Sequence, residues 1–162
     1  MTRILFVCMG NICRSPMAEG ICRHLAQESG LGIEADSAGT GGWHVGAPPD
    51  PRAVRAARAH GIDISDLRAR QFSAEDCQDF DHIVAMDRDN LAHVERLHVA
   101  TGGRARLSLL LDHAAIPIDE VPDPYSGDEA GFQRCFDLIW RGVEGLMAAI
   151  ADGQLASQGS GS

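Results

Sequence analysis

The sequence predicts an α/β fold of one domain, in which helices cover both faces of a parallel sheet. Short apolar runs alternate with segments of helical periodicity, a pattern typical of parallel strands joined by crossover helices. The 162 residues suffice for one domain with a sizeable core. We expect this domain to span residues 1–152, followed by a small, polar, disordered tail at residues 153–162.

Four short apolar segments are the expected strands: residues 3–7, 33–38, 82–86 and 104–111. The expected helices are residues 15–29, 50–60, 73–80, 87–97 and 129–151. Asp50-Pro51 is a good helix start, and Gly30 and Gly61 are good helix stops. Between these elements, residues 39–49 are a loop rich in glycine and proline. Residues 112–128 form a second loop, whose length alone suggests a function.

The last expected helix has the most regular pattern in the chain. Its apolar residues recur at alternating spacings of four and three: Phe132, Phe136, Ile139, Val143, Leu146 and Ile150. This spacing predicts one continuous buried face along the helix.

The most informative stretch joins the first expected strand to the first helix. It reads Val7-Cys8-Met9-Gly10-Asn11-Ile12-Cys13-Arg14-Ser15-Pro16. Ser15 is a good N-cap and Pro16 a good first helical residue, while Gly10 and Asn11 tolerate the positive φ of a tight loop. Backbone N–H groups in such a loop, together with the helix N-terminus, can bind an anion. Ligands also bind at the carboxyl ends of parallel strands, where Cys8 lies.

Cys8 and Arg14 give this loop its chemistry. Inward-pointing amides, an arginine and a helix N-terminus favour the thiolate, the form of cysteine that attacks phosphorus. The Arg14 guanidinium can hold two phosphoryl oxygens at once, and Ser15 can donate to the sulfur when it leaves. The spacing Cys-x5-Arg alone is weak, because it recurs from Cys135 to Arg141 inside a helical pattern. The preceding strand, the Gly-Asn turn and the Ser-Pro helix start make the first match specific.

From Cys8 to Glu19 the chain resembles the phosphate-binding loop of the low-molecular-weight protein tyrosine phosphatases. The resemblance continues through Ser37-Ala38-Gly39-Thr40, Trp43-His44-Val45-Gly46, Asp50-Pro51-Arg52-Ala53, Ala69-Arg70-Gln71, Ala85-Met86-Asp87 and Asp123-Pro124-Tyr125. It covers nearly the whole chain and implies a three-layer fold with a four-stranded parallel sheet and the phosphate loop after strand 1. It also implies hydrolysis of phosphotyrosine and small aryl phosphates through a cysteinyl-phosphate intermediate on Cys8.

The resemblance also assigns roles to individual residues. Cys8 would be the nucleophile, Arg14 would bind the phosphoryl group, and Asp123 would be the general acid and then the base. The phosphate-binding residues would be Met9, Gly10, Asn11, Ile12, Cys13 and Ser15. Trp43 and Tyr125 would form the walls of an aromatic slot too deep for phosphoserine. Without the resemblance, Asp123 also fits a turn residue before proline, and Trp43 fits ordinary loop packing.

Two positions depart from the family pattern. Relatives often carry a histidine where Leu67 stands, and that histidine holds the loop asparagine. Here Asn11 would depend on Ser15, the backbone or water, which predicts a looser loop with reduced activity. Many relatives have a second aromatic residue where Ser126 stands, so the pocket rim is expected to be more open on that side.

Cys13 is the second cysteine of interest. The resemblance implies that it can form a disulfide with Cys8, which would protect the nucleophile from deeper oxidation. Cys22, Cys77 and Cys135 are expected to be bystanders.

Composition argues against several other classes of protein and partner. The net charge of −9 disfavours nucleic acid and anionic membranes as partners. Five cysteines without paired spacing fit a reducing cytoplasm, and we expect neither a membrane-spanning segment nor a signal peptide. Seven histidines without ligand spacing predict no metal, and we expect no cofactor. The expected protein is a cytoplasmic monomer that acts on a phosphotyrosine-containing protein. The family suggests a bacterial tyrosine kinase as this substrate or, for relatives that are secreted, a host protein, and the sequence leaves both open.

Two other functions and one other substrate remain as alternatives. An arsenate reductase of similar fold would need relay cysteines, and residues 86–93 contain none. A non-catalytic phosphate-binding or scaffold protein conflicts with the joint presence of Cys8, Arg14 and Asp123. Phosphoarginine is the rival substrate. Relatives specialised for it carry threonine where Ile12 stands, so Ile12 favours phosphotyrosine.

Overall fold

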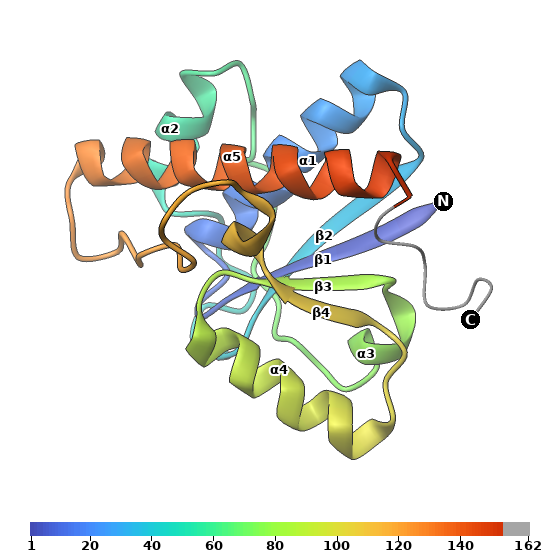
Figure 1. The fold of residues 1–162 in the computed structure, drawn as a ribbon. Coiled ribbons are helices and arrows are strands. Elements are labelled where there is room, and N and C mark those ends of the chain that lie inside the picture. Colours follow the sequence, from blue (N-terminus) through green and yellow to red (C-terminus); the bar gives the residue numbers. More distant parts are fainter. Residues whose placement is uncertain (154–162) are drawn as a thin grey trace.

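The protein forms a three-layer α/β structure around a four-stranded sheet (Figure 1). The structure is a computed structural model and describes residues 1–153. The strands are β1 (Thr2–Cys8), β2 (Ile33–Gly39), β3 (His82–Ala85) and β4 (Arg106–Leu109). They are all parallel and lie in the order β2-β1-β3-β4, so the predicted fold class is confirmed.

Helices cover both faces of the sheet. On one face lie α1 (Arg14–Ser29), α2 (Pro51–Arg58) and α5 (Glu129–Ala151), and on the other lie α3 (Asp76–Asp79) and α4 (Arg88–Thr101) (Figure 1). The central strand β1 supplies both cores: Ile4 and Phe6 pack into the α1/α5 side, whereas Leu5 and Val7 pack into the α4 side. Because both faces of this strand are buried, it is an unbroken apolar run in the sequence.

Ser15 is not the N-cap that its sequence position predicts. Helix α1 begins at Arg14, with Cys13 at the cap position and no side-chain cap bond. The Ser15 hydroxyl instead lies 2.9 Å from Cys8 Sγ and accepts a hydrogen bond from Asn11 Nδ2. A hydroxyl engaged with the loop in this way is not available to cap the helix.

Other boundaries also differ from expectation, and helix α2 ends at Arg58, two residues before its predicted end. The fourth strand ends at Leu109, because the chain turns there into the 3-10 helix η1 (Leu110–His113). Helix α3 is shorter than predicted, since the Asp76 carboxylate accepts the Ser73 N–H and holds the preceding residues in a turn. Helix α4 runs to Thr101, four residues beyond the predicted end, and stops at Gly102.

Helix α5 matches its prediction at both ends, and five of its six periodic apolar residues are buried in the larger core. The predicted tail lies outside the described residues, except for residue 153. Within residues 1–153, no helix is both long enough and apolar enough to cross a membrane.

Candidate active site

The loop that joins β1 to α1 (residues 8–14, the phosphate loop below) is held on two sides. A Cβ on Gly39, at the end of β2, would lie 2.7 Å from the Met9 carbonyl oxygen, so this close approach requires glycine. On the other side, the Asp50 N–H donates to the Ile12 carbonyl at 2.8 Å. The path of the loop is therefore set by contacts with β2 and with the start of α2.

Arg14, the last residue of this loop, is buried, with 3% of its side chain exposed. Its Nη1 donates to the Asp87 carboxylate at 2.7 Å and to the Val121 carbonyl at 2.9 Å. Burial alone would lower the pKa of the guanidinium, but the nearby Cys8 sulfur and the Asp87 carboxylate raise it above its ordinary value. Arg14 therefore keeps its positive charge next to Cys8.

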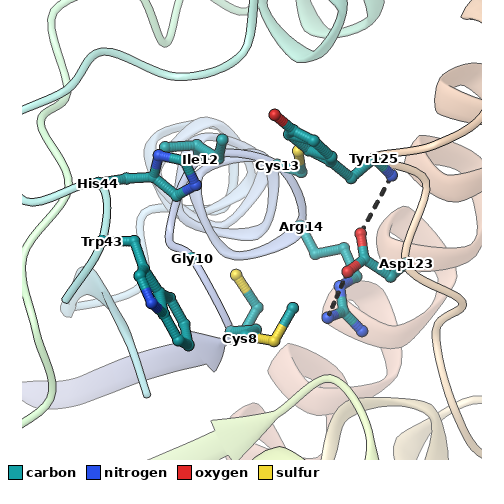
Figure 2. Close-up of a pocket in the computed structure, with 10 residues that line it drawn as sticks. Cys8, Gly10, Ile12, Cys13, Arg14, Trp43, His44, Asp123 and Tyr125 are labelled. Atoms are coloured by element: carbon teal, nitrogen blue, oxygen red, sulfur yellow. Dashed lines mark hydrogen bonds and ion pairs between the residues drawn. The ribbon is translucent and has the colours of Figure 1, made fainter. Parts of the chain in front are cut away.

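Asp123 lies in the loop before α5 (residues 122–128, the Asp123 loop below). Its Oδ2 is 3.7 Å from Arg14 Nη2, and its Oδ1 accepts the Tyr125 N–H at 3.1 Å (Figure 2). The carboxylate is 39% exposed, so solvent and a ligand can both reach it.

These residues surround one pocket of about 370 Å³, shown in Figure 2. It is lined by Cys8, Met9, Gly10, Ile12, Cys13, Arg14, Trp43, His44, Asp123 and Tyr125. Trp43 and His44 lie on one side, while Asp123 and Tyr125 lie on the other. The Trp43 and Tyr125 side chains are exposed, by 74% and 51% of the residue, so they form a rim of flat apolar surface above Cys8. Every lining residue except His44 is predicted as a site residue from the sequence. The His44 ring packs against Gly10.

Comparison with known proteins decides the family. The model of the low molecular weight phosphotyrosine protein phosphatase family matches residues 3–155. The chain belongs to this family. It is therefore a protein-tyrosine phosphatase, a hydrolase.

Individual members of the phosphatase family are similar over nearly their whole length. The low molecular weight protein-tyrosine-phosphatase YfkJ of Bacillus subtilis is 43% identical over 153 residues, which cover 93% of this chain and 96% of YfkJ. The crystal structure of YfkJ superposes with a TM-score of 0.86, at 42% identity, and covers 95% of this chain and 97% of that one. A Drosophila arginine phosphatase superposes with a TM-score of 0.88 at 33% identity, covering 93% and 98%.

The phosphatase holds the strained residue of its loop without a histidine at position 67. Asn11 has φ of +57° and is the one residue other than glycine with positive φ within residues 1–153. Its Nδ2 donates to Ser15 Oγ at 2.8 Å and to Ser37 Oγ at 3.0 Å, and its Oδ1 accepts the Arg70 N–H at 2.9 Å. Leu67 instead packs against the larger core. Ser15 and a backbone group are the partners that the sequence predicts for Asn11, whereas Ser37 is a partner that it does not predict.

Ser37 is itself anchored by a buried carboxylate. Its hydroxyl donates to Glu19 Oε1 at 2.7 Å, and the other Glu19 oxygen pairs with Arg23. Burial raises the pKa of Glu19. The polar network behind the loop thus extends from Asn11 through Ser37 to Glu19 and Arg23 on α1, and each side chain in it contacts the next directly.

Cys13 is buried on the helix side of the loop and also lines the pocket. Burial, together with the nearby Asp50 and Cys8, raises the pKa of its thiol far above its ordinary value. Burial likewise raises the pKa of Cys135 to about 12. Both therefore stay protonated at neutral pH. All five cysteines are free in the structure.

Proposed function

We propose that this phosphatase hydrolyses phosphotyrosine in proteins, and small aryl phosphates, through a cysteinyl-phosphate intermediate on Cys8. One observation carries the proposal: Cys8 and the Arg14 guanidinium share a pocket whose rim holds a carboxylate and two aromatic rings (Figure 2). This combination offers a nucleophile, an anion site, a proton donor and walls for a phenyl ring.

In the first step, the Cys8 thiolate attacks phosphorus. The S–P bond forms as the bond from phosphorus to the phenolic oxygen breaks, and the Asp123 carboxyl gives its proton to that oxygen. Arg14 and the backbone N–H groups of the phosphate loop stabilise the charge on the equatorial oxygens. Because Nη1 of Arg14 is engaged with Asp87 and Val121, we assign Nε and Nη2 to two of these oxygens.

In the second step, water hydrolyses the cysteinyl-phosphate. The Asp123 carboxylate takes a proton from the water, whose oxygen bonds to phosphorus as the S–P bond breaks. Cys8 leaves as a thiolate and receives a hydrogen bond from the Ser15 hydroxyl, whose oxygen lies 2.9 Å from the sulfur. Inorganic phosphate then leaves, and both Cys8 and Asp123 are returned to their starting states.

The pocket walls favour an aryl phosphate over an alkyl one. A phenyl ring between Trp43 and Tyr125 would carry its phosphate down to Cys8, whereas phosphoserine is too short to reach the sulfur from the rim. Phosphoarginine is the second candidate, because the fold is closely similar to that of a phosphatase named for arginine. The apolar Ile12 side chain in the pocket wall favours phosphotyrosine.

We place the enzyme in the cytoplasm, as a monomer of one domain acting on a phosphotyrosine-containing protein such as a bacterial tyrosine kinase. The five free thiols support a reducing compartment.

We also propose that peroxide converts Cys8 to a sulfenic acid, which Cys13 then attacks to form a disulfide and release water. Since Cys13 is held as a thiol, it must lose its proton as the S–S bond forms. Thiols should restore activity to the oxidised parent and fail to do so fully in Cys13→Ser.

The deciding experiment is hydrolysis of p-nitrophenyl phosphate at mildly acidic pH with a chelator and a reductant present. We expect turnover by the parent and by Cys77→Ser, a buried cysteine on the opposite face of the sheet, and none by Cys8→Ser. Rapid acid quenching of the parent should yield a protein carrying one phosphate. Turnover by Cys8→Ser would overturn the mechanism. Faster release of phosphate from phosphoarginine than from phosphotyrosine would overturn the substrate.

A further inference from the structure

Arg52, the second residue of α2, connects the two loops that form the pocket. Its Nη1 donates to the Gly127 carbonyl at 2.7 Å, and its Nη2 donates to the Tyr125 carbonyl at 2.8 Å. Both carbonyls belong to the Asp123 loop. Arg52 itself does not line the pocket, so any effect it has on the reaction passes through the residues it holds.

Arg52 is fixed at its other end by Asp50. The Asp50 carboxylate accepts from Arg52 Nε at 3.0 Å and from Nη2 at 2.9 Å, and it also accepts the Arg52 backbone N–H at 2.8 Å. The Asp50 N–H in turn donates to Ile12 in the phosphate loop. A continuous set of hydrogen bonds therefore runs from the phosphate loop through Asp50 and Arg52 to the Asp123 loop.

Two aromatic rings also lie close to the guanidinium. Its carbon lies 4.5 Å from the centre of the Phe132 ring, which is fully buried in α5, and 5.7 Å from the centre of the Tyr125 ring. Lysine could supply the charge but not the planar fork that serves three acceptor groups at once. The contacts therefore call for arginine at this position.

We propose that Arg52 is a positioning residue that sets where Asp123 delivers its proton, a role that rests on the proposed function of Asp123. The Tyr125 residue is the link: its carbonyl is held by Arg52 while its N–H is held by the Asp123 carboxylate. Holding the backbone of Tyr125 therefore holds the Asp123 carboxylate in position relative to Cys8. Such support matters for Asp123 because its side chain is partly exposed.

The test compares kcat/KM for two substrates, phenyl phosphate and p-nitrophenyl phosphate, because a poor leaving group depends more on the proton. Arg52→Lys should lower kcat/KM about tenfold for phenyl phosphate and less than about threefold for p-nitrophenyl phosphate. Arg55→Lys is the matched control, since Arg55 lies on the same helix and pairs with Glu129 rather than with a loop carbonyl. We expect it to change neither value by more than about twofold.

A double-mutant cycle separates positioning from general stability. In the Asp123→Asn background, which keeps the oxygen that accepts the Tyr125 N–H, Arg52→Lys should change kcat/KM by less than about twofold. A full tenfold loss in that background, or an equal loss for both substrates, would overturn the inference. The Asp123→Asn single variant reports separately on the proposed function. If it loses the same factor in kcat/KM for phenyl phosphate as for p-nitrophenyl phosphate, the acid assignment itself has failed.

A second variant guards against misfolding of Arg52→Lys. Asp50→Asn keeps a good N-cap for α2 but weakens the grip on the Arg52 fork. It should shift the leaving-group dependence in the same direction by a smaller factor. An unchanged dependence in Asp50→Asn, with thermal unfolding near that of the parent, would show that the connection through Asp50 carries no positioning.

Discussion

The phosphate loop and the Asp123 loop face each other across one pocket, yet they are held in place differently. Cys8, Arg14 and Ser15 are buried, and the phosphate loop is supported by hydrogen bonds between buried side chains. Asp123 and Tyr125 are partly exposed, and their loop is held by the fork of Arg52. Removing one partner of a buried hydrogen bond leaves the other partner unsatisfied, whereas a group at an exposed hydrogen bond can bind water instead. Changes on the first side should therefore affect both folding and catalysis, and changes on the second mainly catalysis.

The largest effect is expected from Arg14→Lys. Lysine cannot hold the Asp87 carboxylate and the Val121 carbonyl while also binding two phosphoryl oxygens, so kcat/KM for p-nitrophenyl phosphate should fall about 10³-fold. Thermal unfolding should also shift down, because a buried carbonyl loses its donor. Arg141→Lys, in the second Cys-x5-Arg match, is the control and should leave both values unchanged. A loss smaller than tenfold in Arg14→Lys would contradict the assigned role.

Asp123→Asn should have the next largest effect and should leave stability alone. Without an ionisable proton on this side chain, kcat/KM for phenyl phosphate should fall about 10²-fold, with a smaller loss for p-nitrophenyl phosphate. The melting temperature should stay at the parent value because the side chain is partly exposed and asparagine keeps the bond from the Tyr125 N–H. Asp128→Asn in the same loop is the control, since asparagine serves equally well as the α5 N-cap. Equal rates for Asp123→Asn and parent would remove Asp123 from the mechanism.

The sequence predicted the parts of this pocket that have local signals. The phosphate loop could be recognised because strand, turn and helix start are adjacent in the chain, and Asp123 because it stands in a short motif before α5. Arg52 and Ser37 could not be assigned their contacts in this way. Their partners lie 73 and 26 residues away in the chain, respectively, and nothing in the local sequence indicates which carbonyl or amide they reach. Ser15 was misread for the opposite reason: its local signal was strong, but the buried contact with Cys8 and Asn11 took precedence.

Asn11→Ala tests whether the buried side of the pocket couples folding to catalysis. Alanine is disfavoured at φ of +57°. The substitution also removes the three hydrogen bonds of the Asn11 side chain, so the Arg70 N–H and the Ser37 hydroxyl lose Asn11 as a partner. We expect the free energy of unfolding to fall by about 1–3 kcal/mol and kcat to fall about tenfold. Urea unfolding and p-nitrophenyl phosphate turnover measure the two. A loss of stability with an unchanged kcat would show that the shape of the loop does not depend on Asn11.

Leu67→His should have the smallest effect. Whether kcat rises or stays nearly unchanged shows how completely the loop is already supported. The resemblance to the family implies a histidine at this position that holds the loop asparagine, and its absence predicts a loose loop if nothing takes its place. In this structure both Nδ2 protons of Asn11 are already donated, to Ser15 and Ser37, and its Oδ1 already accepts the Arg70 N–H. A histidine would find one remaining lone pair at most, and it would remove Leu67 from its packing against the core. We therefore expect kcat to change less than about threefold and the melting temperature to fall slightly.

Leu67→Met, which keeps the apolar packing, is the control for the lost contact with the core. A rise in kcat of tenfold or more in Leu67→His alone would mean that the Ser15, Ser37 and Arg70 contacts leave the loop poorly held, and that the buried side of the pocket is no firmer than the exposed one.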